Sequence, residues 1–284
     1  MRGMKLGGVS AMDYTTLCTR EEGSPVDYQM LCEKRWQLQK TLPGIPDEVI
    51  SKFDKAFEIE YAHNSTAIEG NTLTLVQTKA ILEDGLSVGG KTLREIYEVA
   101  NHARAFNYVK DCIAKGRPLD EQTIKDIHAR IMENIQIGGI YRNVEVRITG
   151  ANHKPPPPSE MYWQIKEFCS VLHNPRDLNA IEMAAWTHAE FVRIHPFTDG
   201  NGRTSRMIMN YQLMQAGFLP VSIGIEKRLE YFEALDVYVV NQDLWPFAEM
   251  VAELESQRLD EYLNIACEQG FGDTEDKMEL DFCQ

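Results

Sequence analysis

The chain has 284 residues, of which 43% are hydrophobic and 25% charged, as is typical of a globular protein. The formal net charge of −14 argues against a nucleic-acid partner, because no broad basic surface is implied. The sequence contains no run of about 18 apolar residues, so we expect no membrane span. Six scattered cysteines without a C-x-x-C pair, together with the lack of an apolar leader, lead us to expect a cytoplasmic protein.

The first part of the chain is expected to be helical after an aperiodic tail at residues 1–25. Pro43 to Pro46 interrupt the helical pattern, and glycines punctuate it again between residues 85 and 90. The predicted helices of this part are Tyr28–Thr41, Asp47–His63, Thr74–Asp84 and Leu93–Lys115.

The second part is also predicted to be helical, with one interruption. Residues Val144–Ile148 alternate apolar and charged side chains, which is a strand pattern, and four consecutive prolines follow at 155–158. We therefore expect a short β-hairpin at about residues 144–156. The predicted helices are Pro118–Ile135, Met161–Leu172, Asn179–Ile194, Arg203–Ala216 and Leu229–Ala266, the last with a break near Asp243–Pro246.

The segment His195–Arg206, HPFTDGNGRTSR, has the composition of an anion-binding site. Its glycines, Gly200 and Gly202, permit backbone angles that turn successive N–H groups into one concavity. A helix that begins near Arg203 adds unpaired N–H donors, and Arg203 and Arg206 lie three residues apart on it. Two guanidinium groups beside such a nest suit a polyphosphate.

Two further side chains of this segment have the chemistry of phosphoryl or nucleotidyl transfer. Asp199 offers a carboxylate to a magnesium ion that takes its other ligands from phosphate and water. His195 can accept a proton near neutral pH. Read singly, each feature has a simpler explanation, since a DG or NG pair is usually a plain turn and a lone histidine is usually structural. The residues alone leave both readings open.

The segment resembles the signature of the Fic family, H-x-F-x-D/E-G-N-G-R-x-x-R. All eight fixed positions match: His195, Phe197, Asp199, Gly200, Asn201, Gly202, Arg203 and Arg206. The resemblance extends from about Ala62 to Gln215. It implies an all-α fold, namely a Fic-type helical core with a small β-hairpin flap and no appended DNA-binding domain.

The family resemblance implies protein AMPylation, in which AMP passes from ATP to a Ser, Thr or Tyr hydroxyl of a target protein. His195 would be the general base, and Asp199 would hold Mg²⁺ or Mn²⁺. Phe197 would anchor the loop. Gly200, Asn201 and Gly202 would cradle phosphate, with Arg203 on the β-phosphate side and Arg206 at the γ-phosphate.

Two other segments gain roles from the same resemblance. The flap, about Val144–Pro156, would dock the target by strand addition and bring Ile148, Thr149 and His153 near ATP. Tyr231, Phe232 and Leu235 match the wall of the adenine pocket, whereas Val239 stands where family members often carry Asn. As residues alone, the flap is a structural hairpin, and apolar residues at this spacing are core.

Residues 65–71, STAIEGN, match the inhibitory motif of the family, S/T-x-x-x-E-G/N. Ser65 and Glu69 lie four residues apart, hence on one helical face. In isolation Glu69 would be a surface or capping residue. Beside the signature, it is expected to pair with Arg206 and to restrain the enzyme in cis. A charge-assisted hydrogen bond of about 1.5–3 kcal/mol makes this a leaky brake.

These expectations divide the chain into five regions. Residues 1–25 form a loosely ordered tail, 26–115 a helical region with the inhibitory motif, 116–217 the core with flap and signature, 218–270 C-terminal helices, and 271–284 an acidic tail. Three alternatives stay open: transfer of phosphate, UMP or phosphocholine; removal of AMP; and a non-catalytic peptide-binding module. A homodimer is a further possibility that the resemblance suggests.

Overall fold

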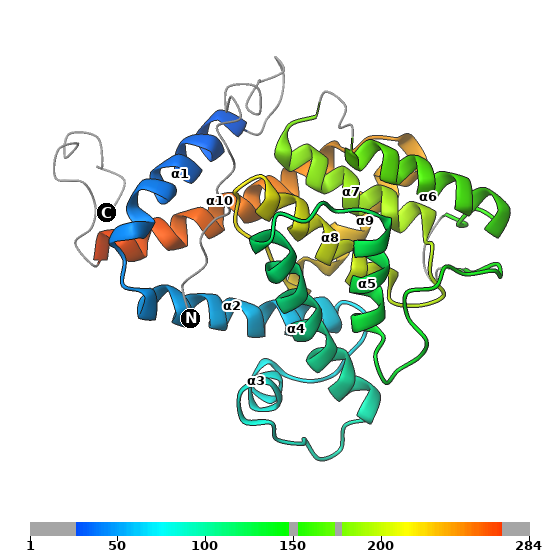
Figure 1. Ribbon diagram of the computed structural model, residues 1–284, viewed down its shortest axis with the longest axis horizontal. Coiled ribbons are helices and arrows are strands. Elements are labelled where there is room, and N and C mark those ends of the chain that lie inside the picture. Colours follow the sequence, from blue (N-terminus) through cyan, green and yellow to red (C-terminus); the bar gives the residue numbers. More distant parts are fainter. Residues whose placement is uncertain (1–26, 148–152, 174–177, 269–284) are drawn as a thin grey trace.

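The structure is a computed structural model that describes residues 27–147, 153–173 and 178–268. The expected tails, 1–25 and 271–284, lie outside the described residues. The described part is helical, as predicted (Figure 1). Its elements are α1 (Tyr28–Thr41), η2 (Leu42–Gly44), α2 (Asp47–Ala67), α3 (Leu75–Asp84), α4 (Leu93–Ala114), α5 (Glu121–Ile131), α6 (Pro158–His173), α7 (Ala180–Ile194), α8 (Asn201–Gln215), η3 (Ile225–Lys227), α9 (Arg228–Asn241) and α10 (Trp245–Glu268).

Polar caps fix where several helices begin. The side chains of Thr74, Thr92 and Asn179 each accept a hydrogen bond from the backbone N–H of the residue three positions later. The side chain of that later residue in turn accepts from the backbone N–H of the capping residue. Such a capping box satisfies two of the N–H groups that a helix start leaves unpaired. Asp120 caps α5 with a single bond to the Thr123 N–H. These caps explain why the predicted starts at 74, 93 and 179 lie within one residue of the observed ones.

Several predicted helix boundaries were wrong by two to four residues: α2 runs on to Ala67 and α6 begins at Pro158, for example. The helix expected over Pro118–Ile135 is only Glu121–Ile131, because Met132 leaves the helical conformation and Asn134 adopts a positive φ of 59°. Helix α8 begins at Asn201 and not near Arg203, because Gly200 supplies a left-handed N-cap with φ of 76°. The earlier start places Gly202 and Arg203 in the first turn of α8.

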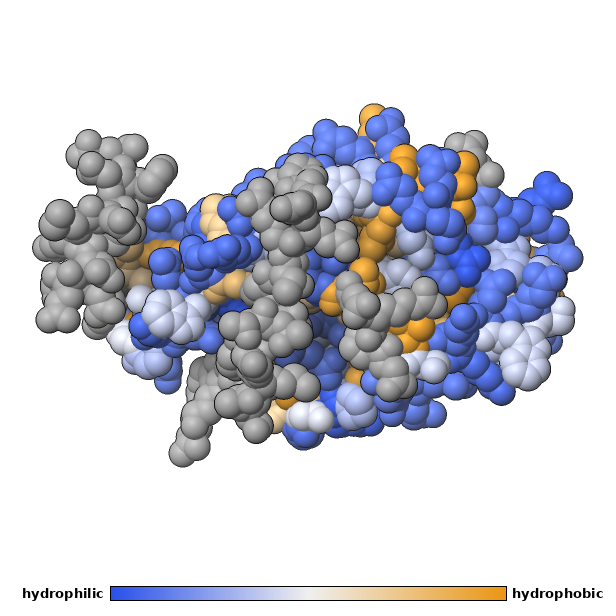
Figure 2. Space-filling model, turned by 90° about the horizontal axis from the view of Figure 1, so that it is seen from above, coloured by the Kyte–Doolittle hydropathy of each residue, from blue (hydrophilic) through white to orange (hydrophobic). Residues whose placement is uncertain are grey.

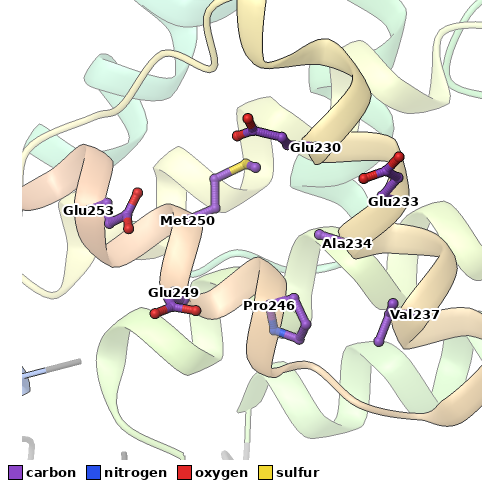
Figure 3. Close-up of a pocket in the computed structure, with 8 residues that line it drawn as sticks. All are labelled: Glu230, Glu233, Ala234, Val237, Pro246, Glu249, Met250 and Glu253. Atoms are coloured by element: carbon purple, nitrogen blue, oxygen red, sulfur yellow. The ribbon is translucent and has the colours of Figure 1, made fainter. Parts of the chain in front are cut away.

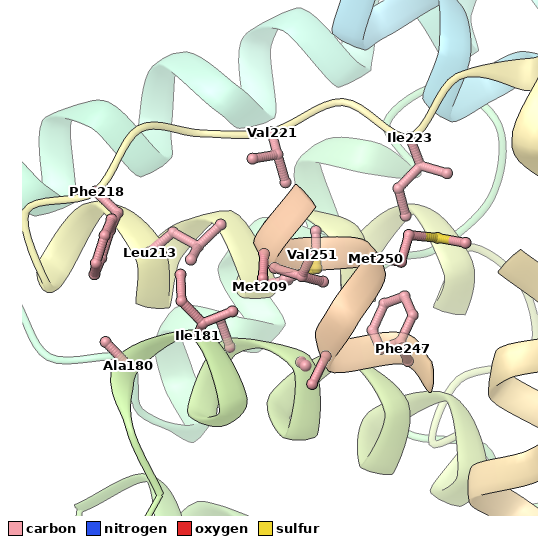
Figure 4. Close-up of a cluster of buried hydrophobic side chains, with 14 of the residues drawn as sticks. Ala180, Ile181, Met209, Leu213, Phe218, Val221, Ile223, Phe247, Met250 and Val251 are labelled. Carbon is pink, nitrogen blue, oxygen red and sulfur yellow. The ribbon is translucent and has the colours of Figure 1, made fainter. Parts of the chain in front are cut away.

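Helices α7 and α8 pack side by side at the centre of the molecule, where α10 covers one side and α4 and α5 cover another (Figure 1). The close-up of the core shows apolar side chains of α7, α8 and α10 meeting the segment that follows α8 (Figure 4). Ile181, Met209 and Val251 in this cluster are at most 1% exposed. The loop between α7 and α8 is therefore carried by the two most enclosed helices.

The flap contains no strand in its described part, residues 144–147 and 153–156. The strand pattern of Val144–Ile148 predicted one. The buried Arg142 side chain donates to the carbonyls of Val144 at 2.9 Å and Pro156 at 2.6 Å, so a side chain satisfies carbonyls that in a hairpin would accept from N–H groups of the facing strand. The prolines of the returning arm also lack N–H donors. The flap is thus closed at its base by Arg142 and not by a strand ladder.

The face of the molecule shown in Figure 2 is mainly hydrophilic, with small hydrophobic areas between hydrophilic residues. Within the described ranges, no helix combines the length and the apolar character that a bilayer crossing requires.

Candidate active site

The loop between α7 and α8 is built from two left-handed residues. His195 ends α7 with φ of 51° and ψ of 60°, which is uncommon for a residue with a Cβ. Gly200 begins α8, and a Cβ at this position would lie 2.7 Å from the sulfur of Met132. The Asn201 side chain holds the turn by bonding both the N–H and the carbonyl of Phe197, each at 2.9 Å. The loop is therefore rigid, and the Asn201 side chain is already engaged within it.

The His195 imidazole is set up to accept a proton. Its Nδ1 lies 3.3 Å from the Val192 carbonyl, which can only accept, so Nδ1 carries the proton and Nε2 keeps a free lone pair. Burial lowers the pKa of His195 to about 4, with nearby Arg142 acting in the same direction. The ring is consequently neutral at pH 7, as a general base requires.

The first turn of α8 offers donors to an anion. The backbone N–H groups of Asn201, Gly202 and Arg203 precede the first intrahelical bond, which runs from the Thr204 N–H to the Gly200 carbonyl at 3.0 Å. Arg203 is 2% exposed; within the described part of the chain its Nε has no hydrogen-bond acceptor, and its Nη1 faces only the Glu98 carboxylate, 3.5 Å away. Buried donors without acceptors, beside a helix N-terminus, fit the phosphates of a nucleotide.

Arg206 is 1% exposed and is held on three sides. It donates to the Ser65 hydroxyl at 3.0 Å and the Ser65 carbonyl at 2.6 Å, to the Tyr231 hydroxyl at 3.1 Å, and to the Glu69 carboxylate at 2.8 Å. The Tyr231 hydroxyl also meets Nε2 of the buried His188 at 3.0 Å. The guanidinium is thus fixed in place, and only one of its partners, Glu69, is an ion.

The Glu69 carboxylate lies where an anion would bind. A Cβ built on Gly202 would overlap it, so the carboxylate rests directly against the first turn of α8. Glu69 follows the end of α2, and its side chain is 37% exposed. An acidic group beside a helix N-terminus and an arginine is favourably placed. The Glu69 carboxylate also occupies the space, and neutralises the Arg206 charge, that a bound phosphate would need.

Asp199 lies within a closed set of four charged side chains. Its Oδ2 accepts from Arg94 at 2.5 Å, and its Oδ1 lies 3.4 Å from Arg203. Glu98 contacts both arginines, at 3.1 Å and 3.5 Å. Burial alone would raise the pKa of Asp199, but Arg203 and Arg94 outweigh it and lower the pKa, so the carboxylate is ionised.

The donor set around Asp199 fits a metal that arrives with a nucleotide. The described residues hold no group of three or more His, Cys, Asp or Glu side chains that could bind a metal by themselves. Magnesium commonly takes one or two protein carboxylates and completes its shell with phosphate oxygens and water. A single ionised carboxylate next to phosphate donors matches this pattern.

The remaining site residues predicted from the sequence are spread over different environments. Ile148 and Thr149 lie outside the described residues. His153 Nε2 meets the Arg193 carbonyl at 2.9 Å. Tyr231 and Leu235 are buried, Tyr231 against Arg206 and Leu235 in the core, so neither presents an open pocket wall. Phe232 is 40% exposed and is the one of the three that is available to stack on a base.

Four residues of the site were not identified from the sequence. Arg94 and Glu98 reach it from α4, His188 lies below Tyr231, and Arg142 joins the flap to His195 through a 2.8 Å bond to the His195 carbonyl. None belongs to a motif that was recognised. The helical spacing of Arg94 and Glu98, four residues apart, was the one available signal, and it also describes an ordinary surface pair.

A separate cavity of about 370 Å³ lies between α9 and α10 (Figure 3). Its lining includes Glu230, Glu233, Glu249 and Glu253 and none of the signature residues. Four carboxylates would repel a polyphosphate, so this cavity is not the nucleotide site.

The site therefore defines a helical domain organised around one rigid loop, a helix start and two buried arginines. Residues 118–213 match the Fic/DOC family. The chain is 35% identical over 268 residues to a protein adenylyltransferase Fic from Nematostella vectensis, and 34% identical over 241 residues to that of Aedes aegypti. These alignments cover 84% and 81% of this chain but only 61% and 47% of the two relatives.

Solved structures give the same result. A fragment of Fic-1 from C. elegans matches with a TM-score of 0.72 and 29% identity, covering 85% of this chain and 72% of the fragment. A variant of that fragment is 30% identical over 84% of this chain and 72% of its own length. A Fic domain containing signaling protein from Bacteroides thetaiotaomicron matches with a TM-score of 0.75 and 26% identity, over 84% of this chain and 97% of its own. The chain belongs to the Fic family, and the all-α fold expected from the signature is confirmed.

Proposed function

We propose that the protein is a protein adenylyltransferase that transfers AMP from ATP to a Ser, Thr or Tyr hydroxyl of a target protein. The observation that supports this most directly is the convergence at one loop of a neutral His195, an ionised Asp199 and the donors of α8 and Arg203. Relatives named protein adenylyltransferase Fic match most of this chain. The chain spans less than two thirds of their length, so the activity is inferred here.

In this proposal, Nε2 of His195 removes the proton from the target hydroxyl. The hydroxyl oxygen then forms a bond to the α-phosphorus as the bond to the departing pyrophosphate breaks. Backbone N–H groups of the first turn of α8 and the Arg203 guanidinium stabilise the phosphate charge in fixed positions. Asp199 would hold Mg²⁺ or Mn²⁺, which neutralises charge on the phosphates when bound. Arg206 would hold the γ-phosphate.

Glu69 would act as a brake on this reaction. It occupies Arg206 and rests against Gly202, so a γ-phosphate and the Glu69 carboxylate compete for the same guanidinium. Because a carboxylate and an incoming phosphate repel each other, ATP would bind weakly or in an unproductive pose.

Docking of the target on the flap is also part of the proposal. Val144 is 52% exposed at the flap, and an extended target segment could add there as a strand. The homodimer is a separate proposal from the family resemblance; Leu86, between α3 and α4, is 57% exposed and Leu93, the first residue of α4, is 69% exposed. Measurement of the molecular mass in solution tests it. A cytoplasmic location and the lack of a nucleic-acid partner stay predictions.

The decisive experiment is label transfer from ATP, using the Glu69→Gly variant to remove the brake. Label at the α-phosphate that appears on protein supports AMP transfer, whereas label at the γ-phosphate means phosphate transfer and overturns the proposal. His195→Ala in the same background should abolish labelling. Labelling that survives His195→Ala would refute the catalytic assignment, and UTP or a choline nucleotide as donor tests the related transfers.

A second activity, removal of AMP, follows from one feature of Glu69. Arg206 binds only its Oε1, and no hydrogen bond to Oε2 is found among the described residues. A carboxylate oxygen with a free lone pair can orient a water molecule toward a modified hydroxyl. Release of AMP from a premodified target by the wild type, and its loss in Glu69→Gly, would support this activity.

A further inference from the structure

Arg94 occupies the carboxylate that the proposed function assigns to the metal. It lies in the first turn of α4, far from the signature in sequence, and its Nη2 donates to Oδ2 of Asp199 at 2.5 Å. The Arg94 side chain is 56% exposed, whereas that of Arg203, on the other side of the carboxylate, is 2% exposed. The two arginines thus contact Asp199 from different environments, Arg94 from the solvent-exposed surface and Arg203 from the buried core.

Both oxygens of Asp199 are engaged in this arrangement. Oδ1 accepts from the Gly200 N–H at 2.6 Å and lies 3.4 Å from Arg203, while Oδ2 faces Arg94. A divalent cation must approach one of these oxygens closely, and a guanidinium at the same oxygen would repel it. Oδ2 is the accessible choice, because the partners of Oδ1 belong to the rigid loop and the buried α8 arginine.

Arg94 can leave Oδ2 without losing every partner. Its Nε also donates to Oε1 of Glu98 at 3.1 Å. Glu98 is itself held, because its Oε2 accepts from the Asn71 side chain at 3.0 Å. Glu98 therefore stays in place while the end of the Arg94 side chain moves, and the pair separates at the modest cost typical of exposed ion pairs.

We propose that Arg94 is a resident counter-cation of Asp199, which neutralises the carboxylate when no metal is present and competes with Mg²⁺ for it. This rests on the proposed role of Asp199. Arg94 would be a positioning residue that acts through Asp199 and not a group that touches the nucleotide. Loss of Arg94 should then have opposite effects on nucleotide binding with and without the metal.

The experiment measures the dissociation constant of ADP by calorimetry, with the whole 284-residue chain, in the presence of Mg²⁺ and in the presence of EDTA. ADP lacks the γ-phosphate that would compete with Glu69 for Arg206, and Glu69 is present in every variant compared, so its effect on ADP binding cancels in the comparison. In Arg94→Ala, ADP with Mg²⁺ should bind roughly two- to fivefold more tightly, because the metal no longer displaces a cation. ADP in EDTA should bind more weakly, because the uncompensated Asp199 carboxylate repels phosphate. Arg94→Gln, which keeps the length of the side chain, should behave in the same way.

Arg104→Ala is the matched control, since Arg104 lies on the same helix, is 50% exposed and pairs with Glu133 at 2.7 Å away from Asp199. It should change neither constant.

Two results would overturn the proposal. If both dissociation constants rise in Arg94→Ala, Arg94 binds the phosphates directly. If both constants are unchanged, Arg94 and Asp199 form an ordinary surface ion pair. Asp199→Ala should remove the effect of Mg²⁺, and a persisting effect also overturns it. Since ADP binding needs no transfer, opposite shifts would support the role of Arg94 even if AMP transfer were absent.

Discussion

Glu69 and Arg206 are 137 residues apart in the chain and meet at 2.8 Å, with the arginine buried and the carboxylate at the edge of the site. The pairing predicted from the two motifs is present in the structure. The proposed brake on AMP transfer rests on this pair.

Replacing Glu69 by Gly should raise AMP transfer by about one to two orders of magnitude. The estimate follows from removal of a charge-assisted hydrogen bond worth about 1.5–3 kcal/mol that competes with ATP for Arg206. The rate of α-label transfer from ATP checks it. Glu133→Ala, which breaks another Glu–Arg pair of 2.7 Å on the surface, should leave the rate unchanged. Equal rates in wild type and Glu69→Gly would contradict the brake.

The pH dependence of transfer should reflect the environment of His195. Burial lowers the pKa of His195 to about 4 from an ordinary value of 6.5. Only the protonated ring is inactive as a base, so a lowered pKa moves the loss of activity to lower pH. In the Glu69→Gly variant, kcat/KM should stay nearly constant from about pH 7.5 down to about pH 5.5. A fall to half its value near pH 6.5, with the fold intact by circular dichroism, would show that His195 titrates normally.

Tyr231→Phe should weaken ATP binding through Arg206. The variant removes an acceptor of the buried guanidinium and the partner of His188 at 3.0 Å, and leaving buried donors unpaired costs about 1–3 kcal/mol. We expect lower thermal stability together with a several-fold weaker affinity for ATP, measured in the Glu69→Gly background. Tyr238→Phe on the same helix removes a 2.8 Å bond to Glu190 and should lower stability without changing ATP affinity. If both variants bound ATP with the same affinity, Tyr231 would have no role in ATP binding.

Arg142→Met should reduce transfer to a protein target while leaving ADP affinity within about twofold. The variant keeps much of the side-chain length but leaves the carbonyls of Val144, Pro156 and His195 without their donor, so the base of the flap loosens. The measurements are kcat/KM for a protein target and the dissociation constant of ADP. Lys52→Met, an exposed residue of α2 paired with Glu48 and outside the flap, is the control and should change neither. An unchanged kcat/KM in Arg142→Met would show that Arg142 does not support the flap in target binding.

The helices could be predicted from the sequence because their causes are local. Periodic apolar residues and the caps at Thr74, Thr92 and Asn179 act over a few positions. The flap was harder, because alternation at Val144–Ile148 predicts a strand only if a partner strand is available. In the described part, Arg142 takes the backbone carbonyls and the prolines withhold donors.

The signature loop by itself determined the rigid turn, the start of α8 near it and the family to which the chain belongs. The resemblance also supplied the Glu69–Arg206 pair. Only the tertiary structure placed Arg94 on Asp199, Tyr231 and Ser65 around Arg206, and Arg142 beneath His195. These contacts join helices that are distant in the chain, so they depend on how α2, α4, α8 and α9 pack and not on any local sequence pattern. The residues of the loop indicate which ligands it could bind. Tertiary packing decides which side chains contact the loop in the structure, namely Arg94 at Asp199 and Glu69 at Arg206.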